Sequence, residues 1–188
     1  MIETIGLNYR EEGCGQPLIL MHGMFGSLNN LSQLGNLLSK HYRVIRVDLR
    51  NHGNSPHHPE MNFPVMAADI IRLLDKLDID KASLIGHSLG GKVAMQAAID
   101  YPQRIEKLVV MDIAPVPYPA TGHEDILDGL MALYLNPPPS RSAAEETLSH
   151  SVHNEHLRAF LLTNLVRKPN KNNEQVLQLR INMPAICE

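Results

Sequence analysis

The sequence predicts an α/β fold in which a mostly parallel, doubly wound sheet is followed by a helical segment. Short apolar runs alternate with longer helical patterns from Pro17 to about Ala114, which is typical of parallel strands joined by crossover helices. A proline-rich connection, IAPVPYPATG, then leads into a stretch with mostly helical patterns. We therefore expect a core over residues 1–116 and a helical cap over residues 117–188.

Four short apolar segments predict the strands of the core. They are PLILMHG, YRVIRVDLR, ASLIGHS and EKLVVMDIA, over residues 17–23, 42–50, 82–88 and 106–114. The first, third and fourth are nearly continuous apolar runs, which is typical of strands covered on both faces. The second is mixed, so we expect Arg43 and Arg46 to lie near an edge or an end. ETIGLN and YREEG, over residues 3–8 and 9–13, are expected to add two antiparallel edge strands.

Helical patterns separate these strands and dominate the end of the chain. Crossover helices are predicted over residues 28–41, 64–79 and 89–101. Pro64 suits a first helical turn, and Pro102 ends the third of these helices. After the proline-rich connection, helices are predicted over residues 123–136, 142–151, 154–168 and 173–183, and no further buried strand is expected.

Composition and charge exclude several classes of partner. The 188 residues carry a net charge of −3 and offer no basic face to nucleic acid. No stretch approaches the roughly 20 apolar residues of a membrane span, and the N-terminus lacks a signal-peptide pattern, so we expect no membrane partner and a cytoplasmic location. Cys14 and Cys187 are too few for a disulfide framework and lack metal-ligand spacing. We expect neither a cofactor nor a metal.

The segment GHSLG, from Gly86 to Gly90, fits the G-x-S-x-G pattern between a predicted strand and a predicted helix. This is the context of a nucleophile elbow, in which a serine is held on a sharp turn and the glycines avoid collisions. Ser88 is the predicted nucleophile, and the backbone N–H of Leu89 is a predicted donor to an oxyanion. The alternative is a glycine-rich turn without chemistry. A dinucleotide motif is disfavoured because Ser88 occupies the middle glycine of G-x-G-x-x-G.

A second motif, HGMFGS, follows the first predicted strand of the parallel sheet. The backbone N–H of Met24 is the predicted second oxyanion donor, because this loop supplies one in nucleophile-elbow enzymes. We expect His22, next to Gly23, to tie loop backbones together through its ring nitrogens rather than to act in catalysis. Phe25 and Met24 are candidates to line an acyl pocket, and plain core packing is the equal alternative.

Together, HGMFGSLNNL, VDLRNHGNSP, LIGHSLGG and VVMDIAPVPY resemble the α/β-hydrolase superfamily, and specifically its YbfF-type bacterial esterase branch. Asn51 stands where the superfamily commonly has glycine in D-x-R-G-x-G-x-S. The resemblance implies an α/β-hydrolase fold with a helical cap, and a serine hydrolase that cleaves esters or thioesters of short to medium acyl chains through an acyl-enzyme. It also implies that Asp48 fixes the loop beginning RNHGNS.

The resemblance implies that Asp112 is the acid of a catalytic triad, because YbfF-type esterases carry an aspartate after the corresponding strand. Asp112 also follows its strand at the sheet edge expected for Ser88; capping of loop backbone is the alternative role. The family's catalytic histidine lies in strands and helices that would follow Glu188. The later histidines His123, His150, His153 and His156 fall in cap-like helices, so no base is assigned.

The predicted cap supplies candidate pocket residues. Leu130, Met131, Tyr134 and Phe160 would line a substrate pocket if the helices cover the strand ends, although an amphipathic cap needs the same residues for packing. Because no base is assigned, two further interpretations stay open. The chain is a catalytically incomplete fragment or a binding protein, or a second chain or segment supplies the missing part of its site. We expect an uncovered sheet edge over residues 109–113, which would promote self-association.

Overall fold

The computed structural model describes residues 2–117, 124–169 and 172–187. Residue contacts divide the chain into two compact units, Met1–Val116 and Pro117–Glu188. The boundary falls in the proline-rich connection, where the sheet-forming segments end.

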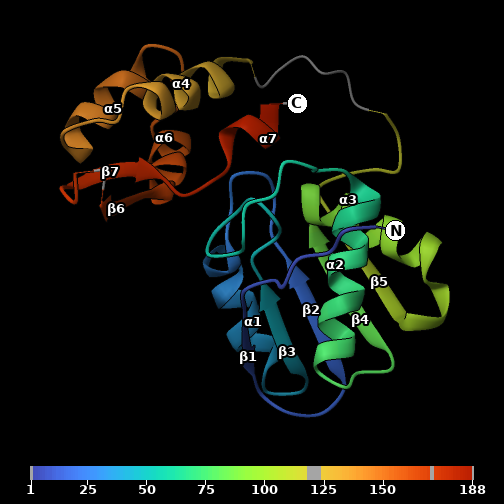
Figure 1. The fold of residues 1–188 in the computed structure, drawn as a ribbon. Helices are drawn as coiled ribbons and strands as arrows, with labels where there is room; N and C mark the ends of the chain where they lie inside the picture. The colour runs from blue at the N-terminus through green and yellow to red at the C-terminus, as the bar shows by residue number, and fades with distance from the viewer. Residues whose placement is uncertain (1, 118–123, 170–171, 188) are drawn as a thin grey trace. The chain divides into compact units, whose positions relative to one another are not determined.

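The first unit contains a five-stranded, mostly parallel sheet (Figure 1). Its strands are β1 (Tyr9–Glu12), β2 (Pro17–Met21), β3 (Arg43–Val47), β4 (Ala82–His87) and β5 (Ile105–Met111). They lie in the order β1-β3-β2-β4-β5, and only β1 runs antiparallel to its neighbour. The four predicted parallel strands are therefore present, and β5 lies at the edge of the sheet.

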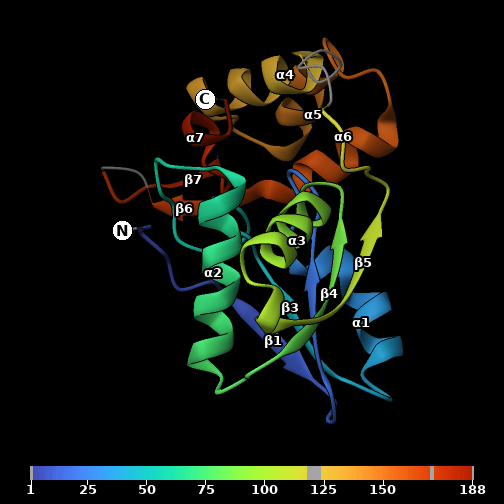
Figure 2. The ribbon, with the colours of Figure 1, turned by 90° about the vertical axis from the view of Figure 1, so that its right-hand side faces the viewer.

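Helices cover the two faces of this sheet (Figure 2). They are α1 (Ser32–Leu38), α2 (Phe63–Lys76) and α3 (Leu89–Asp100), with short 3₁₀ turns at Leu28–Leu31 and Pro102–Arg104. Side chains alternate along β2, so Ile19 and Met21 join the larger core, which includes residues of α2 and α3. Leu18 and Leu20 join a smaller core on the opposite face, where Leu34 and Leu38 of α1 pack.

Part of the N-terminal prediction was wrong. Residues 3–8 do not form a strand, and only β1 pairs with the sheet. Side chains hold most of this segment instead: Ile5 N–H donates to Asp69 Oδ1 at 2.8 Å and Asn8 N–H donates to Ser55 Oγ at 2.9 Å, while Asn8 O accepts the backbone N–H of Asp48. Sequence alternation cannot distinguish such side-chain anchoring from a strand.

The two arginines of β3 have different surroundings. Arg43 begins the strand, as predicted, and forms an exposed pair with Glu11. Arg46 is buried one strand in from the sheet edge, where its Nη2 lies 2.6 Å from Glu12 Oε1. Its burial depends on β1, which supplies the opposing glutamate.

The fourth predicted parallel strand is not covered on both faces. Leu108 and Val109 of β5 are 39% and 48% exposed. The continuous apolar run in EKLVVMDIA predicts burial, but β5 is hydrogen-bonded to β4 alone in the described sheet.

The second unit combines helices with a hairpin. Its elements are α4 (Glu124–Leu135), α5 (Arg141–Ser149), α6 (Glu155–Leu161), a 3₁₀ turn (Leu162–Asn164), β6 (Leu165–Pro169), β7 (Gln175–Leu179) and α7 (Met183–Cys187). The helix predicted over residues 173–183 was therefore wrong, as was the end of the one over 154–168. The antiparallel pairing of Leu165 with Leu179, both buried, outweighs the weak helical pattern of these short segments.

A buried ion pair joins the loop after β3 to α2. Arg50 donates to both carboxylate oxygens of Asp69, at 2.7 and 2.9 Å, and the two side chains are 0% and 1% exposed. Arg50 also donates to the carbonyl oxygens of Glu60 and Glu3, at 2.7 and 3.2 Å. The pair therefore anchors three separate segments of the first unit.

We expect Asp69→Ala to lower the free energy of unfolding by about 3–5 kcal/mol, because it leaves the Arg50 charge buried and unpaired. Chemical denaturation measures this change. Glu11→Ala is the matched control, since it breaks the exposed pair with Arg43 and should cost less than about 1 kcal/mol. Similar losses in the two variants would contradict the assigned importance of the buried pair.

Candidate active site

Ser88 lies on a strained turn between β4 and α3. Its backbone angles are φ 49° and ψ −111°, a region that non-glycine residues rarely occupy. The turn is held on both sides, because Ser88 N–H donates to Met111 O on β5 at 3.0 Å and Lys92 N–H donates to Ser88 O at 3.1 Å. The surrounding fold therefore imposes a conformation that the serine would not adopt by itself.

The glycines of GHSLG allow a close approach of backbone segments. A Cβ atom on Gly86 would lie 2.2 Å from Gly90 O, and one on Gly90 would lie 2.5 Å from Met21 O on β2. Both contacts are with backbone, which cannot move aside as a flexible side chain can. The spacing of the motif therefore follows from the packing of α3 against the ends of β4 and β2.

The loop after β2 lies beside Ser88. Gly90 N–H donates to His22 O at 3.1 Å, and a Cβ atom on Gly23 would lie 3.4 Å from Ser88 Cβ. Met24, the next residue, is half-buried against the larger core. Leu89 begins α3, so its N–H has no acceptor within the helix.

Phe25 has two features that bear on its predicted role in a pocket. Its side chain is 6% exposed, and its φ is 61°. The loop therefore buries this ring, which leaves little of it to line an open pocket. Among the described residues, Met24 is the more accessible of the two candidates in this loop.

His22 is fully buried and bridges two loops. Its Nε2 accepts the Leu49 N–H at 3.0 Å, so Nδ1 carries the proton and donates to Gly23 O at 2.8 Å. Both ring nitrogens thus hold backbone, which is the arrangement expected for a structural histidine.

Asp48 organises the loop that follows β3. Its Oδ1 accepts the Leu28 N–H at 2.7 Å, and its Oδ2 accepts Asn8 Nδ2 and the Asn54 N–H at 2.7 and 2.8 Å. Gly53 has φ 55° and approaches so closely that a Cβ there would lie 2.1 Å from Asp48 Cγ. The buried carboxylate therefore accepts hydrogen bonds from several segments at once and holds them together.

Asp112 follows β5 at the same end of the sheet as Ser88. The two positions are linked through Met111, whose carbonyl oxygen accepts the Ser88 N–H. Asp112 has φ 57°, and its side chain is 85% exposed. Its Oδ2 lies 3.5 Å from Nε2 of His87, the residue before Ser88. A Cβ atom on Gly23 would lie 2.9 Å from His87 Nδ1, so this ring lies between the Gly23 loop and Asp112.

His87 was missed because it occupies a variable position of G-x-S-x-G. Ser88, Leu89, Gly23 and Asp112 lie near the carboxyl ends of β2, β4 and β5, and Met24 follows Gly23 in the same loop. A parallel sheet gathers the residues that follow its strands at one edge.

The predicted cap residues belong to the second unit. Leu130 is fully buried in that unit, Met131 and Phe160 are half-buried, and Tyr134 is 42% exposed. His123 lies outside the described residues. His150, His153 and His156 are exposed, and no group of three or more potential metal-ligating side chains occurs in the part of the chain that the structure describes.

His52 is a second buried histidine that the sequence analysis did not single out. Its Nδ1 pairs with Arg50 O at 2.9 Å, and its ring centroid lies 5.3 Å from that of His22. Burial is the largest cause of a lowered pKa of His52, which falls from 6.5 to about 3. The nearby His22 and His57 also lower this pKa, whereas the hydrogen bond to Arg50 O raises it. His52 therefore stays neutral in the folded protein over the physiological pH range.

The strain at Ser88 should be measurable. We expect Ser88→Gly to raise the free energy of unfolding by about 1 kcal/mol, because glycine adopts positive φ without a Cβ penalty. Ser88→Ala is the matched control, since it removes the hydroxyl but keeps the Cβ. Chemical denaturation measures the free energy of unfolding of both variants. Equal values for the two would contradict the strain.

His52 should contribute to acid sensitivity. The unfolded state binds a proton below a pH of about 6.5, whereas folded His52 does not bind one until about pH 3, so stability falls as pH falls between these values. In His52→Asn, the dependence of unfolding free energy on pH from 7 to 5 should weaken by up to about 1.4 kcal/mol per pH unit. His150→Gln, at an exposed histidine, should leave the slope unchanged. An unaltered slope in His52→Asn would contradict the assignment.

Comparison with known proteins identifies the family. Residues 16–182 match the model of the alpha/beta hydrolase fold family. The Escherichia coli esterase YbfF is 42% identical over 150 residues, which cover 80% of this chain and 59% of that protein. An sn-1-specific diacylglycerol lipase of Xenopus laevis is 40% identical over 179 residues, covering 92% of this chain and 56% of the lipase. The chain thus spans little more than half the length of these curated relatives.

Comparison with solved structures supports the same family. A marine microorganism esterase superposes with a TM-score of 0.90 and 34% sequence identity, covering 97% of this chain and 71% of that one. Within the described residues, no helix is both long and apolar enough to cross a membrane. The family match over residues 16–182 and the mostly parallel sheet establish that this chain belongs to the alpha/beta hydrolase fold family.

Proposed function

We propose that this chain carries the nucleophile and oxyanion site of a carboxylic-ester hydrolase. The observation that carries the proposal is the strained turn at Ser88, which is held between β5 and α3 beside the Gly23 loop. Strain of this kind persists where the surrounding structure over-determines it, and it is concentrated at functional sites. Similarity to proteins named as esterases and lipases supports the same reaction class.

In the proposed reaction, Ser88 Oγ attacks the acyl carbonyl carbon and a base removes the hydroxyl proton. The carbonyl oxygen becomes an oxyanion that accepts hydrogen bonds from the Leu89 and Met24 N–H groups. The alcohol or thiol leaves with the proton, and an acyl-enzyme remains on Ser88. Water then attacks the ester carbonyl, which releases the carboxylic acid and restores the serine. No step in this sequence needs a metal or cofactor.

The base in this proposal is a histidine oriented by Asp112. The exposed carboxylate of Asp112 at the Ser88 end of the sheet is accessible to such a ring. The family resemblance implies a histidine in this role, and we assign the role to none of the histidines among residues 1–188. Asp112 would fix its tautomer and stabilise the imidazolium that forms when the serine proton is taken.

The proposed substrates are esters or thioesters of short to medium acyl chains. Met24 follows Gly23 in the loop beside Ser88, and its thioether side chain, which packs against the larger core, can adapt to acyl groups of different shape. In this proposal the second unit acts as the cap, and Met131, Tyr134 and Phe160 are its accessible candidates for substrate contact. The buried Leu130 would support them by packing.

A second candidate function is a binding scaffold that lacks hydrolytic power. The observation in its favour is that the histidine in contact with Asp112 is His87, which belongs to the elbow itself. Oxyanion donors alone leave only a residual rate, because the missing base costs several orders of magnitude.

A fluorophosphonate probe tests the proposed nucleophile. We expect intact-mass spectrometry to show one adduct on the 188-residue chain, which forms slowly because no base is assigned among these residues, and none on Ser88→Ala, which lacks the hydroxyl. Ser142→Ala, at an exposed serine in the first turn of α5, is the matched control and should retain the adduct. Labelling that persists in Ser88→Ala would refute the assignment. An unlabelled wild-type chain would favour the scaffold.

A further inference from the structure

The segment that follows β5 is irregular and depends on its neighbours for its conformation. Residues 112–117 form neither helix nor strand, and Asp112, which begins the segment, has φ 57°. Non-glycine residues rarely keep a positive φ without support, because the Cβ atom then crowds the following carbonyl group. The exposed carboxylate of Asp112 is therefore placed by the residues that hold this segment.

The first residues of α3 contact this segment. A Cβ atom on Gly91 would lie 2.6 Å from Ile113 Cγ2, so the absence of a side chain at Gly91 lets Ile113 pack against the helix. Lys92 Nζ donates to Val116 O at 2.6 Å. The Lys92 N–H is in turn bonded to Ser88 O at 3.1 Å. The segment is therefore anchored to the same helical turn that holds Ser88.

Contacts from the elbow hold the chain on both sides of Asp112. Before it, Ser88 N–H donates to Met111 O at 3.0 Å. At Asp112 itself, Oδ2 lies 3.5 Å from His87 Nε2. After it, the ammonium group of Lys92 holds the far end of the segment. The stretch of chain from His87 to Lys92 thus contacts this segment at its start and at its end.

The helix itself does not account for a lysine at this position. Lys92 is the fourth residue of α3, close to the end at which the helix dipole places positive partial charge. A cation is disfavoured there and is favoured at the other end of a helix. The ammonium group instead donates a charge-assisted hydrogen bond to the Val116 carbonyl, which is stronger than a bond between neutral groups. The contact with Val116 therefore supplies a reason for this lysine that the helix alone does not.

We propose that Lys92 is a positioning residue for Asp112. Its ammonium group fixes Val116 against α3, while the elbow fixes the end of β5. The short segment between these two points then keeps Asp112 at positive φ, with its carboxylate beside His87. In this role Lys92 acts through Asp112 and touches no reacting atom. The use of Asp112 as an acid rests on the function proposed above, whereas the positioning itself does not.

Loss of the Lys92 hydrogen bond would remove one of the two fixed points. The freed segment would let Asp112 relax to a negative φ, which most residues prefer. Because rotation about φ changes the direction of the Cβ atom, this relaxation would turn the carboxylate away from His87. The order of the segment and the direction of the carboxylate should therefore change together.

NMR relaxation of the full 188-residue chain tests the order of the segment. Lys92→Met keeps the apolar stem of the side chain but removes the ammonium group. We expect the backbone amide order parameters within residues 113–116 to fall from about 0.85 to below about 0.6 in this variant. Lys92→Arg should restore them, since a guanidinium group also donates to a carbonyl oxygen.

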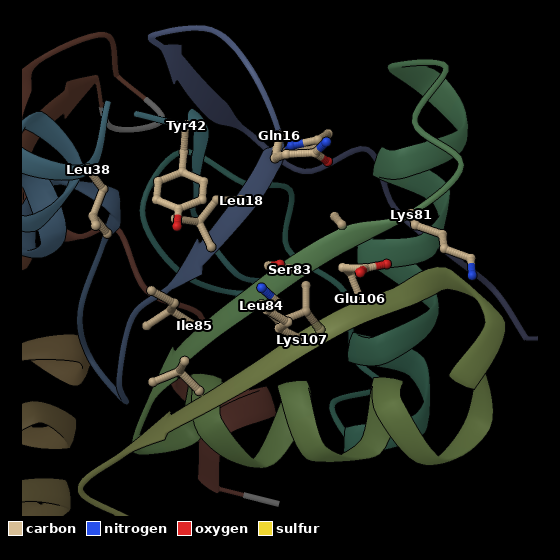
Figure 3. A pocket seen from close by; sticks show the side chains of 13 residues that line it. Gln16, Leu18, Leu38, Tyr42, Lys81, Ser83, Leu84, Ile85, Glu106 and Lys107 are labelled. Carbon is tan, nitrogen blue, oxygen red and sulfur yellow. The ribbon is translucent and has the colours of Figure 1, made fainter. Parts of the chain in front are cut away.

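Lys107→Met is the matched control. Lys107 is an exposed lysine of β5 that lines a cavity of the first unit (Figure 3). It precedes Asp112 by five residues, which is roughly 16 Å along an extended chain. Its replacement should leave the order parameters of residues 113–116 unchanged.

The ring of His87 reports the direction of the carboxylate. Asp112→Asn removes the carboxylate charge beside the ring and should shift the NMR signal of His87 Nε2. Lys92→Met should shift this signal in the same direction by at least half as much, because the carboxylate has turned away. Adding Lys92→Met to Asp112→Asn should cause no further shift, since Lys92 acts through Asp112.

Thermal unfolding of each variant shows that it is folded. The proposal is overturned if the order parameters stay near 0.85 in Lys92→Met, if Lys92→Arg or Lys107→Met loses as much order, or if the His87 signal does not move in Lys92→Met. Neither readout uses the reactivity of Ser88. Failure of the fluorophosphonate to label the chain would therefore bear on the proposed function alone, and the NMR measurements would still decide the role of Lys92.

Discussion

The site depends on the close contact between the start of α3 and the end of β2. Gly90 lies so near the Met21 carbonyl that no side chain fits between them, and its N–H is bonded to His22 O. This contact brings the loop after β2 against the turn after β4. Ser88, Leu89 and the Gly23 loop are neighbours for this reason, and the positive φ of Ser88 is the conformational cost of the arrangement.

A frame of buried polar groups maintains that geometry. Asp48 binds segments before and after β3, His22 bridges the loops after β2 and β3, and Arg50 joins the β3 loop to α2 through Asp69. Each interaction is charge-assisted or fully buried. Removal of one partner would leave the other as a buried polar group without a hydrogen-bond partner, because water does not reach it. The rigid support of the site therefore comes from side chains that do not take part in the proposed reaction.

The carboxyl ends of the strands and the outer strand β5 present different surfaces. At the carboxyl ends of the strands, polar side chains and backbone N–H groups converge on Ser88 and Asp112. Along the outer strand the surface is instead apolar, with Leu108 and Val109 accessible. The first arrangement is suited to chemistry on a small substrate, whereas the second leaves apolar side chains accessible on the outer strand.

The sequence alone determined the fold class, the four parallel strands and the elbow, because these depend on local hydrophobic patterning and on a glycine spacing that backbone packing requires. It did not predict the β6–β7 hairpin, whose pairing of Leu165 with Leu179 is a contact between distant residues. It also missed His52, whose low pKa results from burial beside His22, and the contact of His87 with Asp112. Tertiary structure decided these features, because strand pairing, burial and proton affinity depend on neighbours that lie far apart in the chain.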